Sequence, residues 1–175
     1  MFVKPEEVID TIDARPGIKA ADFGAGSGFY AIPLAKRVGP SGKVYAFDVR
    51  KEILEVIRSR ARALGVGNIE TIWTDLEKNK GSNLKDESID LVIISNILFQ
   101  LEDKHKLAAE AFRVLKQKGK VALVEWTEEE KPIGPKLANR INRKDAEDIF
   151  VGAGFRFEKE FNPGEHHYGL ILIKP

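Results

Sequence analysis

Short apolar runs alternate with segments of helical periodicity along most of this chain, and this alternation restricts the fold more than any other feature. Five apolar runs predict buried strands: Ile18–Phe23, Val44–Phe47, Ile69–Trp73, Leu91–Ile94 and Val121–Val124. Helical spacing of apolar residues predicts helices from about Pro5, near Phe29–Val38, over Lys51–Leu64 and over Lys106–Leu115. Strands that alternate with helices form a parallel sheet covered on both faces, so we expect an α/β fold.

The C-terminal part of the chain departs from this alternation. A helix that Asn142 caps and Gly154 ends is followed by two predicted strands, Phe155–Phe161 and His167–Ile173. The turn Asn162–Gly164 lies between these two strands, and this connection is too short for a parallel crossover. The last two strands must therefore be antiparallel. Because the chain has no internal repeat and no Gly-, Pro- or Ser-rich linker, we expect one domain over residues 1–175.

Composition and charge exclude several functional classes. The formal net charge is +1, so no strong field favours nucleic acid or a membrane surface. The chain has no cysteine, which removes disulfides, thiolate nucleophiles and cysteine-based zinc sites, and its three histidines lack metal-ligand spacing. The first residues lack the apolar run of a signal peptide, and nothing approaches the about 20 apolar residues of a membrane span. We expect a cytoplasmic protein without a metal site, a membrane partner or a strong nucleic-acid signal.

Glycines and acidic residues follow the first three predicted strands. The first strand runs directly into Asp22–Gly28, whose glycines let the backbone turn sharply and approach a ligand closely. Asp48 ends the second strand, where a carboxylate can accept both hydroxyls of a ribose, and Asp75 follows the third. Ligands of such sheets bind at the carboxyl ends of the parallel strands. Each feature alone is common as a turn or a cap, but together at one sheet edge they predict a nucleoside-containing ligand.

A nicotinamide dinucleotide is one alternative for this ligand. Gly26, Gly28 and Ala31 satisfy the G-x-G-x-x-A spacing of dinucleotide-binding enzymes, which would make the protein an oxidoreductase. That register moves the turn away from the strand end, and Asp22 would place a negative charge near the pyrophosphate. An acid at this position is better suited to a ligand that carries an ammonium group and no phosphate.

These residues resemble the class I S-adenosylmethionine-dependent methyltransferases from about Lys19 to the C-terminus. The resemblance includes the acid-x-Gly-x-Gly-x-Gly motif, Asp48, Asp75–Leu76, Asp90–Asn96 and the stretch Leu115–Gly119. Within the class, Ser95–Phe99 looks like the small-molecule branch related to ubiquinone/menaquinone C-methyltransferases. The resemblance implies a Rossmann-like, doubly wound, seven-stranded sheet of order 3-2-1-4-5-7-6 with strand 7 antiparallel. It also implies methyl transfer to a small-molecule acceptor.

The resemblance implies a role for each residue that matches the motifs. Asp22 would orient the ammonium of S-adenosylmethionine, and the Ser95 carbonyl would meet the same group. Asp48 would bind the ribose. The remaining positions would line the methionine moiety (Phe23, Gly24, Ala25, Gly26 and Gly28) or the adenine (Val49, Asp75 and Leu76).

Catalytic residues follow from the direction of the last strand. If this strand runs antiparallel, it starts at the cofactor edge, which places His166, His167 and Tyr168 near the methyl group. His166 and His167 are therefore the candidates for a general base, which is required only if the acceptor loses a proton. Glu125 and Trp126, at the end of the fifth strand, face the same edge.

The sequence leaves more than one possibility for the acceptor site. The segment Lys131–Arg140 lacks helical periodicity, and we expect it to form part of the acceptor-site wall. Only about 17 residues precede the first strand, so we expect either an open pocket or one closed by a partner chain such as a second copy. A non-catalytic partner subunit that binds S-adenosylmethionine is the remaining alternative, although the intact glycines and acids argue against it.

Overall fold

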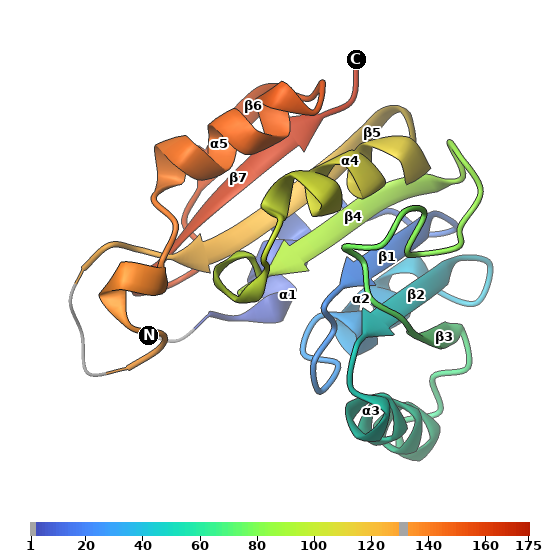
Figure 1. Cartoon of the computed structure of the whole chain (residues 1–175). Coiled ribbons are helices and arrows are strands. Elements are labelled where there is room, and N and C mark those ends of the chain that lie inside the picture. The colour runs from blue at the N-terminus through green and yellow to red at the C-terminus, as the bar shows by residue number, and fades with distance from the viewer. Residues whose placement is uncertain (1–2, 130–132) are drawn as a thin grey trace.

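Seven strands form one sheet in the computed structural model, which describes residues 3–129 and 133–175. The strand order is β3-β2-β1-β4-β5-β7-β6, and β7 pairs antiparallel with both of its neighbours (Figure 1). Both features confirm the predicted sheet. The strands are β1 (Lys19–Phe23), β2 (Lys43–Asp48), β3 (Ile69–Trp73), β4 (Ile89–Ser95), β5 (Leu115–Trp126), β6 (Arg156–Phe161) and β7 (His167–Ile173).

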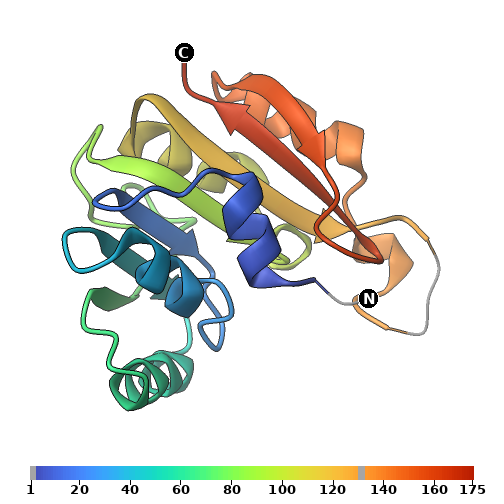
Figure 2. The ribbon, with the colours of Figure 1, turned by 180° about the vertical axis from the view of Figure 1, so that it is seen from behind.

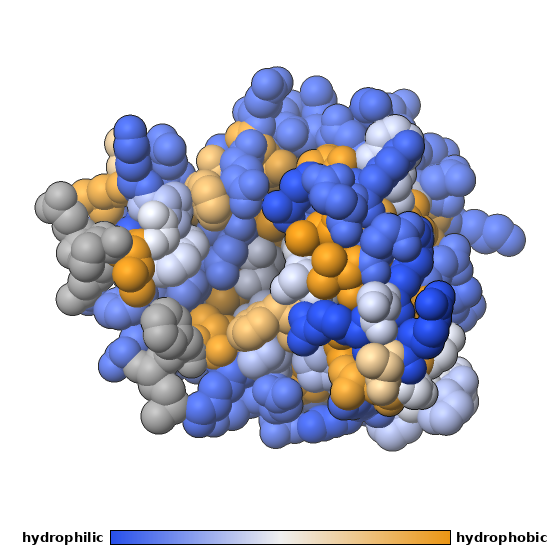
Figure 3. All heavy atoms as spheres, turned by 90° about the horizontal axis from the view of Figure 1, so that it is seen from below, coloured by the Kyte–Doolittle hydropathy of each residue, from blue (hydrophilic) through white to orange (hydrophobic). Residues whose placement is uncertain are grey.

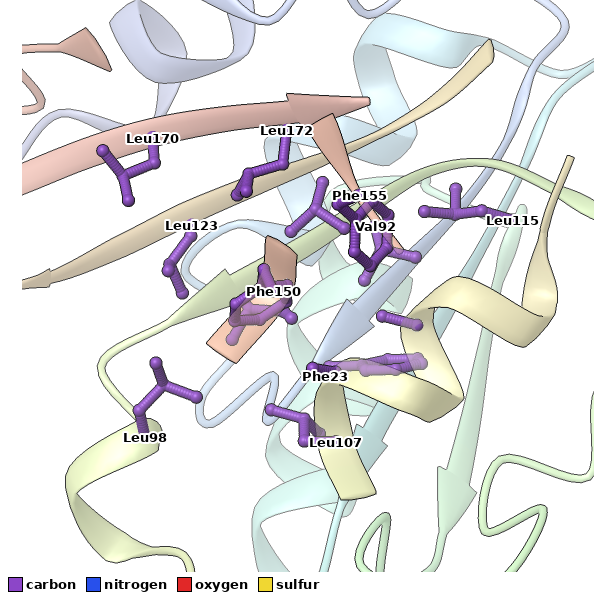
Figure 4. Packing of buried hydrophobic residues seen from close by; sticks show 14 of the residues in the cluster. Phe23, Val92, Leu98, Leu107, Leu115, Leu123, Phe150, Phe155, Leu170 and Leu172 are labelled. Atoms are coloured by element: carbon purple, nitrogen blue, oxygen red, sulfur yellow. The ribbon is translucent and has the colours of Figure 1, made fainter. Parts of the chain in front are cut away.

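Helices cover both faces of the sheet, and each face has its own apolar core. Side chains of α1 (Pro5–Thr11), α2 (Ala31–Val38) and α3 (Lys51–Ala63) pack on one face, seen from behind in Figure 2. Those of α4 (Lys104–Val114) and α5 (Arg143–Gly152) pack on the other, where Phe23, Leu107 and Phe150 belong to one buried cluster (Figure 4). Two short 3-10 helices are η1 (Leu98–Gln100) and η2 (Leu137–Asn139). Alternation along each strand divides its side chains between the two cores.

Local sequence explains where the helices begin. Asn142 accepts a hydrogen bond from the N–H of Asp145 at 2.8 Å, which is the side-chain cap that the sequence predicts for α5. Asp103 caps α4 in the same way through the N–H of His105. Pro33 is the third residue of α2, where the helix leaves N–H groups unbonded in any case, so it interrupts no helical hydrogen bond.

Two details of the predicted alternation are wrong. The helix expected to reach Leu115 ends at Val114, and β5 begins at Leu115 rather than Val121, because Leu115 pairs with Ile89 before a register shift. Residues 74–88, between β3 and β4, contain no helix. This crossover is instead held by side chains of α4: Glu110 accepts from the backbone N–H of Ser82 at 3.0 Å, and Arg113 donates to the carbonyl of Leu84 at 2.8 Å.

Within the described part of the chain, no helix combines the length and the apolar character that crossing a bilayer requires.

Candidate functional site

The glycine-rich turn after β1 is held against the end of β2. The N–H groups of Gly24 and Ala25 both donate to the carbonyl of Phe47, at 3.0 and 2.8 Å. Gly24 has φ +81°, and a Cβ there would lie 2.5 Å from Cγ2 of Ile97. Gly26 has φ +51° with open space where its Cβ would be. The turn therefore needs glycine for two reasons, conformation at both positions and close packing at Gly24.

Asp48 links this turn to the second strand. Its side chain is buried, and Oδ2 accepts a hydrogen bond from the N–H of Gly26 at 3.1 Å. Oδ1 accepts from the N–H of Arg50 at 3.0 Å and from its Nε at 3.1 Å. The Nη2 of Arg50 lies 3.4 Å from Oδ2. The carboxylate is thus oriented by two backbone N–H groups and covered by one guanidinium.

A cavity of about 310 Å³ opens beside this carboxylate. It brings together six of the predicted cofactor-site residues, namely Gly24, Gly26, Asp48, Val49, Asp75 and Leu76. Asn96, Ile97, Gln100, Leu101 and Leu107 are among the residues of its other wall. The arrowheads of β1, β2 and β4 point to the lower left in Figure 1. Figure 3 views the molecule from below, where apolar side chains lie exposed among charged ones. The cavity lies at the carboxyl ends of the strands, as expected for this fold.

The other predicted cofactor-site residues do not line this cavity. Asp22, Phe23 and Ala25 are buried, and the side chain of Phe23 belongs to the core under α4. Gly28 closes the turn by donating its N–H to the carbonyl of Ala25 at 2.9 Å. Ser95 is half-buried at the end of β4.

Asp22 is a buried acid with one carboxylate oxygen that accepts no hydrogen bond from the described residues. It is 1% exposed, and its Oδ2 has no hydrogen-bond partner among the described residues. Burial raises the pKa of this carboxyl to about 7; a hydrogen bond from the backbone of Ala31 opposes the rise, and the charge of Asp48 adds to it. A cation bound beside Asp22 would satisfy the oxygen and stabilise the ionised form.

Buried polar atoms without a partner collect along this edge of the sheet. Among the described residues they are Asp22 Oδ2, Tyr30 Oη, Asn96 Oδ1, Thr127 Oγ1 and His167 Nε2. Asn96 and Thr127 directly follow β4 and β5, and His167 begins β7. Asp22 is the penultimate residue of β1, and Tyr30 directly precedes α2. Because buried polar atoms are normally hydrogen-bonded, such a row indicates a place where ligand or water supplies the partners.

Asp75 and Glu125 are committed to neighbouring backbone. Oδ1 of Asp75 accepts from the N–H of Glu77 at 2.9 Å, which leaves Oδ2 for a ligand. Glu125 is 1% exposed, and its Oε1 accepts from the N–H groups of Ile97 and Leu98 at 2.9 and 2.7 Å. Glu125 therefore faces the expected edge but fixes the turn that leads into η1.

The two candidate bases lie apart from the glycine turn. His166 and His167 line an open cavity of about 700 Å³ together with Thr127, Glu129 and Tyr168. His167 pairs with Trp126 across β5 and β7, and their rings lie 4.2 Å apart. Its Nδ1 is 3.0 Å from the carbonyl of Glu165, and burial lowers its pKa. The fold thus brings His167 to the predicted edge, with β4 and β5 between it and β1.

The expected acceptor wall is described in part. Lys131 and Pro132 lie outside the described residues. Arg140 donates to the carbonyls of Thr127, Ile133 and Pro135 at 2.9, 2.9 and 3.0 Å, and its guanidinium lies 5.5 Å from the Trp126 ring. A single side chain therefore ties much of this segment to the end of β5.

Sequence reasoning missed Arg50, Tyr30 and the wall that η1 contributes. The sequence could have indicated Arg50, because a cationic side chain two residues after a strand-end Asp can fold back onto the carboxylate. No sequence pattern indicates Tyr30 or the η1 residues, because their positions depend on packing between distant elements.

Comparisons with known proteins agree with this geometry. Residues 14–150 match the family described as "Methyltransferase domain". Over 135 residues the chain is 35% identical to the ubiquinone/menaquinone biosynthesis C-methyltransferase UbiE of Pasteurella multocida, covering 77% of this chain and 48% of that protein. A crystal structure of a SAM dependent methyltransferase from Aquifex aeolicus superposes with a TM-score of 0.90 at 28% identity, covering 99% of this chain and 90% of that one. The [4+2]-cyclase SpnF shares the fold alone, with a TM-score of 0.83 at 14% identity over 98% of this chain and 80% of that one.

Proposed function

We propose, from the premise that the chain belongs to the methyltransferase domain family, that it transfers a methyl group from S-adenosylmethionine to a small-molecule acceptor. The chain spans about half the length of the curated UbiE relative it matches, so the reaction is argued from this chain's own site. The fold by itself does not fix the reaction, and the structural similarity to a cyclase illustrates this.

One observation carries the proposal: the Asp48 carboxylate and the glycine turn form one wall of the 310 Å³ cavity, and Asp75 and Leu76 line the same cavity. Asp48 provides acceptors for ribose hydroxyls. Asp75 Oδ2 and the backbone at Leu76 provide an acceptor and a donor for an adenine edge. Val49 is 60% exposed beside them and offers an apolar surface for the base.

Asp22 supports the choice of this cofactor over a dinucleotide. The methionine part of S-adenosylmethionine carries an ammonium group, which the unpartnered Oδ2 of Asp22 suits directly or through water. A pyrophosphate would instead meet the charges of Asp22 and Asp48 on either side of the glycine turn. The acids and the glycine cradle therefore fit the adenosyl amino acid.

When bound, S-adenosylmethionine would supply a methyl group whose carbon an acceptor atom can attack in line, with S-adenosylhomocysteine as the leaving group. The contribution of this chain is then mainly to hold two molecules in reacting geometry. Asp48, the glycine turn and Asp22 would hold the cofactor. The edge between Ser95 and Trp126 would position the acceptor, and Arg140 fixes the segment that follows Trp126.

His167 is the proposed base for acceptors that lose a proton. Donation from Nδ1–H to the Glu165 carbonyl leaves Nε2 as a proton acceptor, and Nε2 has no partner among the described residues. Burial lowers the pKa of this ring, so it is neutral at physiological pH. His166 lines the same open cavity and has φ +67°. We assign it to the rim of the acceptor site and not to proton transfer.

Calorimetry with the purified chain tests the cofactor. We expect S-adenosylmethionine and S-adenosylhomocysteine to bind at micromolar concentration and NAD(H) to give no heat. Asp48→Asn keeps the shape of the side chain but removes its charge, so it should weaken S-adenosylhomocysteine binding by about tenfold or more, since hydrogen bonds to charged groups contribute about 1.5–3 kcal/mol. Glu70→Gln, on the exposed face of β3, is the charge-matched control. Binding of NAD(H) alone would refute the proposal, and so would adenosyl binding that Asp48→Asn leaves unchanged.

A further inference from the structure

The Asp48 carboxylate has no acceptor position left for a ribose. A carboxylate offers about four lone-pair sites. The N–H groups of Gly26 and Arg50 take two of them, at 3.1 and 3.0 Å. The guanidinium of Arg50 takes the other two, with Nε 3.1 Å from Oδ1 and Nη2 3.4 Å from Oδ2.

The two kinds of donor differ in how easily they move. The N–H groups belong to the glycine turn and to the residue that caps α3, so they are fixed by the backbone. The Arg50 side chain is 56% exposed and lines the cavity, and Asp48 is the acidic partner of its ion pair. Because more than half of the guanidinium side chain is exposed, water can take over its hydrogen bonds when it leaves the buried carboxylate. The guanidinium can therefore leave the carboxylate while the backbone keeps the carboxylate oriented.

We propose that Arg50 competes with the cofactor's ribose for Asp48 and thereby sets how tightly the adenosyl ligand is held and how readily it leaves. The inference rests on the proposed function, because it takes Asp48 as the ribose acceptor. Two ribose hydroxyls would replace two guanidinium N–H groups, so the number of hydrogen bonds on the carboxylate stays constant. The free energy needed to break the ion pair then lowers the binding free energy of the cofactor and of the product by the same amount.

Removing the competing group should tighten binding. Arg50→Met keeps an unbranched side chain without charge or donors. We expect it to lower the Kd for S-adenosylhomocysteine by at least about threefold, because even a fully exposed ion pair contributes up to about 1 kcal/mol. Arg62→Met is the matched control, because Arg62 lies in the last turn of α3 and its side chain makes no hydrogen bond or ion pair with the described residues. We expect its Kd to equal that of the unaltered chain.

A second measurement isolates the ribose. Adenosine is uncharged and has both hydroxyls, whereas 2′,3′-dideoxyadenosine has neither, and ligand-observed NMR measures weak binding of both. Arg50→Met should tighten adenosine binding and leave dideoxyadenosine unchanged. The salt dependence of adenosine binding is an independent test. Salt screens the attraction between Arg50 and Asp48, so the unaltered chain should bind adenosine more tightly as the salt concentration rises. Arg50→Met should remove this dependence.

The outcomes separate the inference from the proposed function. If S-adenosylhomocysteine binds and Arg50→Met binds it equally or more weakly, the competition does not exist and Arg50 holds the ligand or is idle. If the variant tightens adenosine and dideoxyadenosine alike, the effect does not act through the ribose and the inference is likewise overturned. If neither S-adenosylhomocysteine nor adenosine binds the unaltered chain or Arg50→Met, the proposed function itself fails.

Discussion

Glu125, at the end of β5, accepts a hydrogen bond from the backbone N–H of Leu98 at 2.7 Å. The same oxygen accepts from the N–H of Ile97 at 2.9 Å, so one buried carboxyl holds the turn that contributes Ile97 to the cavity. Ile97 in turn lies against Gly24. A residue 28 positions away in the sequence thus fixes the part of the cavity wall that packs against the glycine turn.

Glu125 should make the free energy of unfolding depend on pH. Burial raises the pKa of its carboxyl from 4.5 to about 7, against hydrogen bonds from Leu98, Ile97 and Trp126. A raised pKa means that the folded state binds the proton more tightly, so this stabilisation is full below pH 4.5 and is lost as pH rises through 7. Glu125→Gln stays neutral, so its melting temperature should match that of the unaltered chain at pH 5 and exceed it at pH 8.

A truncation at the same position separates charge from hydrogen bonding. Glu125→Ala leaves the N–H groups of Ile97 and Leu98 without an acceptor, which should make it about 1–3 kcal/mol less stable than Glu125→Gln at either pH. Chemical denaturation at pH 5 and pH 8 measures both variants. Equal stability of Glu125→Gln and the unaltered chain at pH 8 would contradict the burial argument.

Alanine substitutions at Gly24 and Gly26 should separate stability from binding. Both glycines have positive φ, and a left-handed residue with a Cβ costs about 1–2 kcal/mol. Gly24→Ala adds a clash with Ile97 and should lower the melting temperature more. Gly26→Ala meets open space that we assign to the cofactor, so it should fold yet bind S-adenosylhomocysteine at least about tenfold more weakly. Normal binding by Gly26→Ala would remove that turn from the site.

Binding of an adenosyl amino acid should strengthen as pH rises from 6 to 8. The Asp22 carboxyl has a pKa of about 7, and the ligand's ammonium favours its ionised form. Only about one carboxyl in ten is ionised at pH 6, so the affinity for S-adenosylhomocysteine should rise by up to about tenfold. Calorimetry in two buffers of different ionisation enthalpy should show proton release near pH 6.

Two controls make the pH test specific to Asp22. 5′-Methylthioadenosine lacks the ammonium group, so its affinity should not change with pH. Asp22→Asn should remove the pH dependence for S-adenosylhomocysteine. A dependence that persists in Asp22→Asn would assign the titration to another group.

His167 should be neutral at pH 7 with its proton on Nδ1. The carbonyl of Glu165, 3.0 Å from Nδ1, selects this tautomer, and burial lowers the pKa of the ring. Nitrogen-15 chemical shifts of the imidazole report both properties. His167→Ala should bind S-adenosylhomocysteine normally, because His167 does not line that cavity, and should lose turnover with a proton-releasing acceptor. Full turnover by both His166→Ala and His167→Ala would exclude a histidine base.

The sequence by itself determined the order of elements and the positions of the strand-end groups. Apolar runs and helical periodicity are local, so they located the strands and the helices. The turn Asp22–Gly28 and the acids Asp48 and Asp75 followed from their places at the strand ends. The short connection before His167 determined that β7 is antiparallel, and hence that His167 lies at the ligand edge. The end of α4 at Val114 was missed, because the pairing of Leu115 with Ile89 overrode the helical period.

Only the tertiary structure decided which groups meet. Gly26 and Asp48 are joined across 22 residues, Ile97 fills the space over Gly24, and the row of unpartnered polar atoms draws on residues from Asp22 to His167. Such contacts depend on rotamers and packing between elements that are distant in sequence, so no local sequence pattern predicts them. The guanidinium of Arg50 on the Asp48 carboxylate lies only two residues away, yet it too depends on the space and exposure that the folded cavity provides.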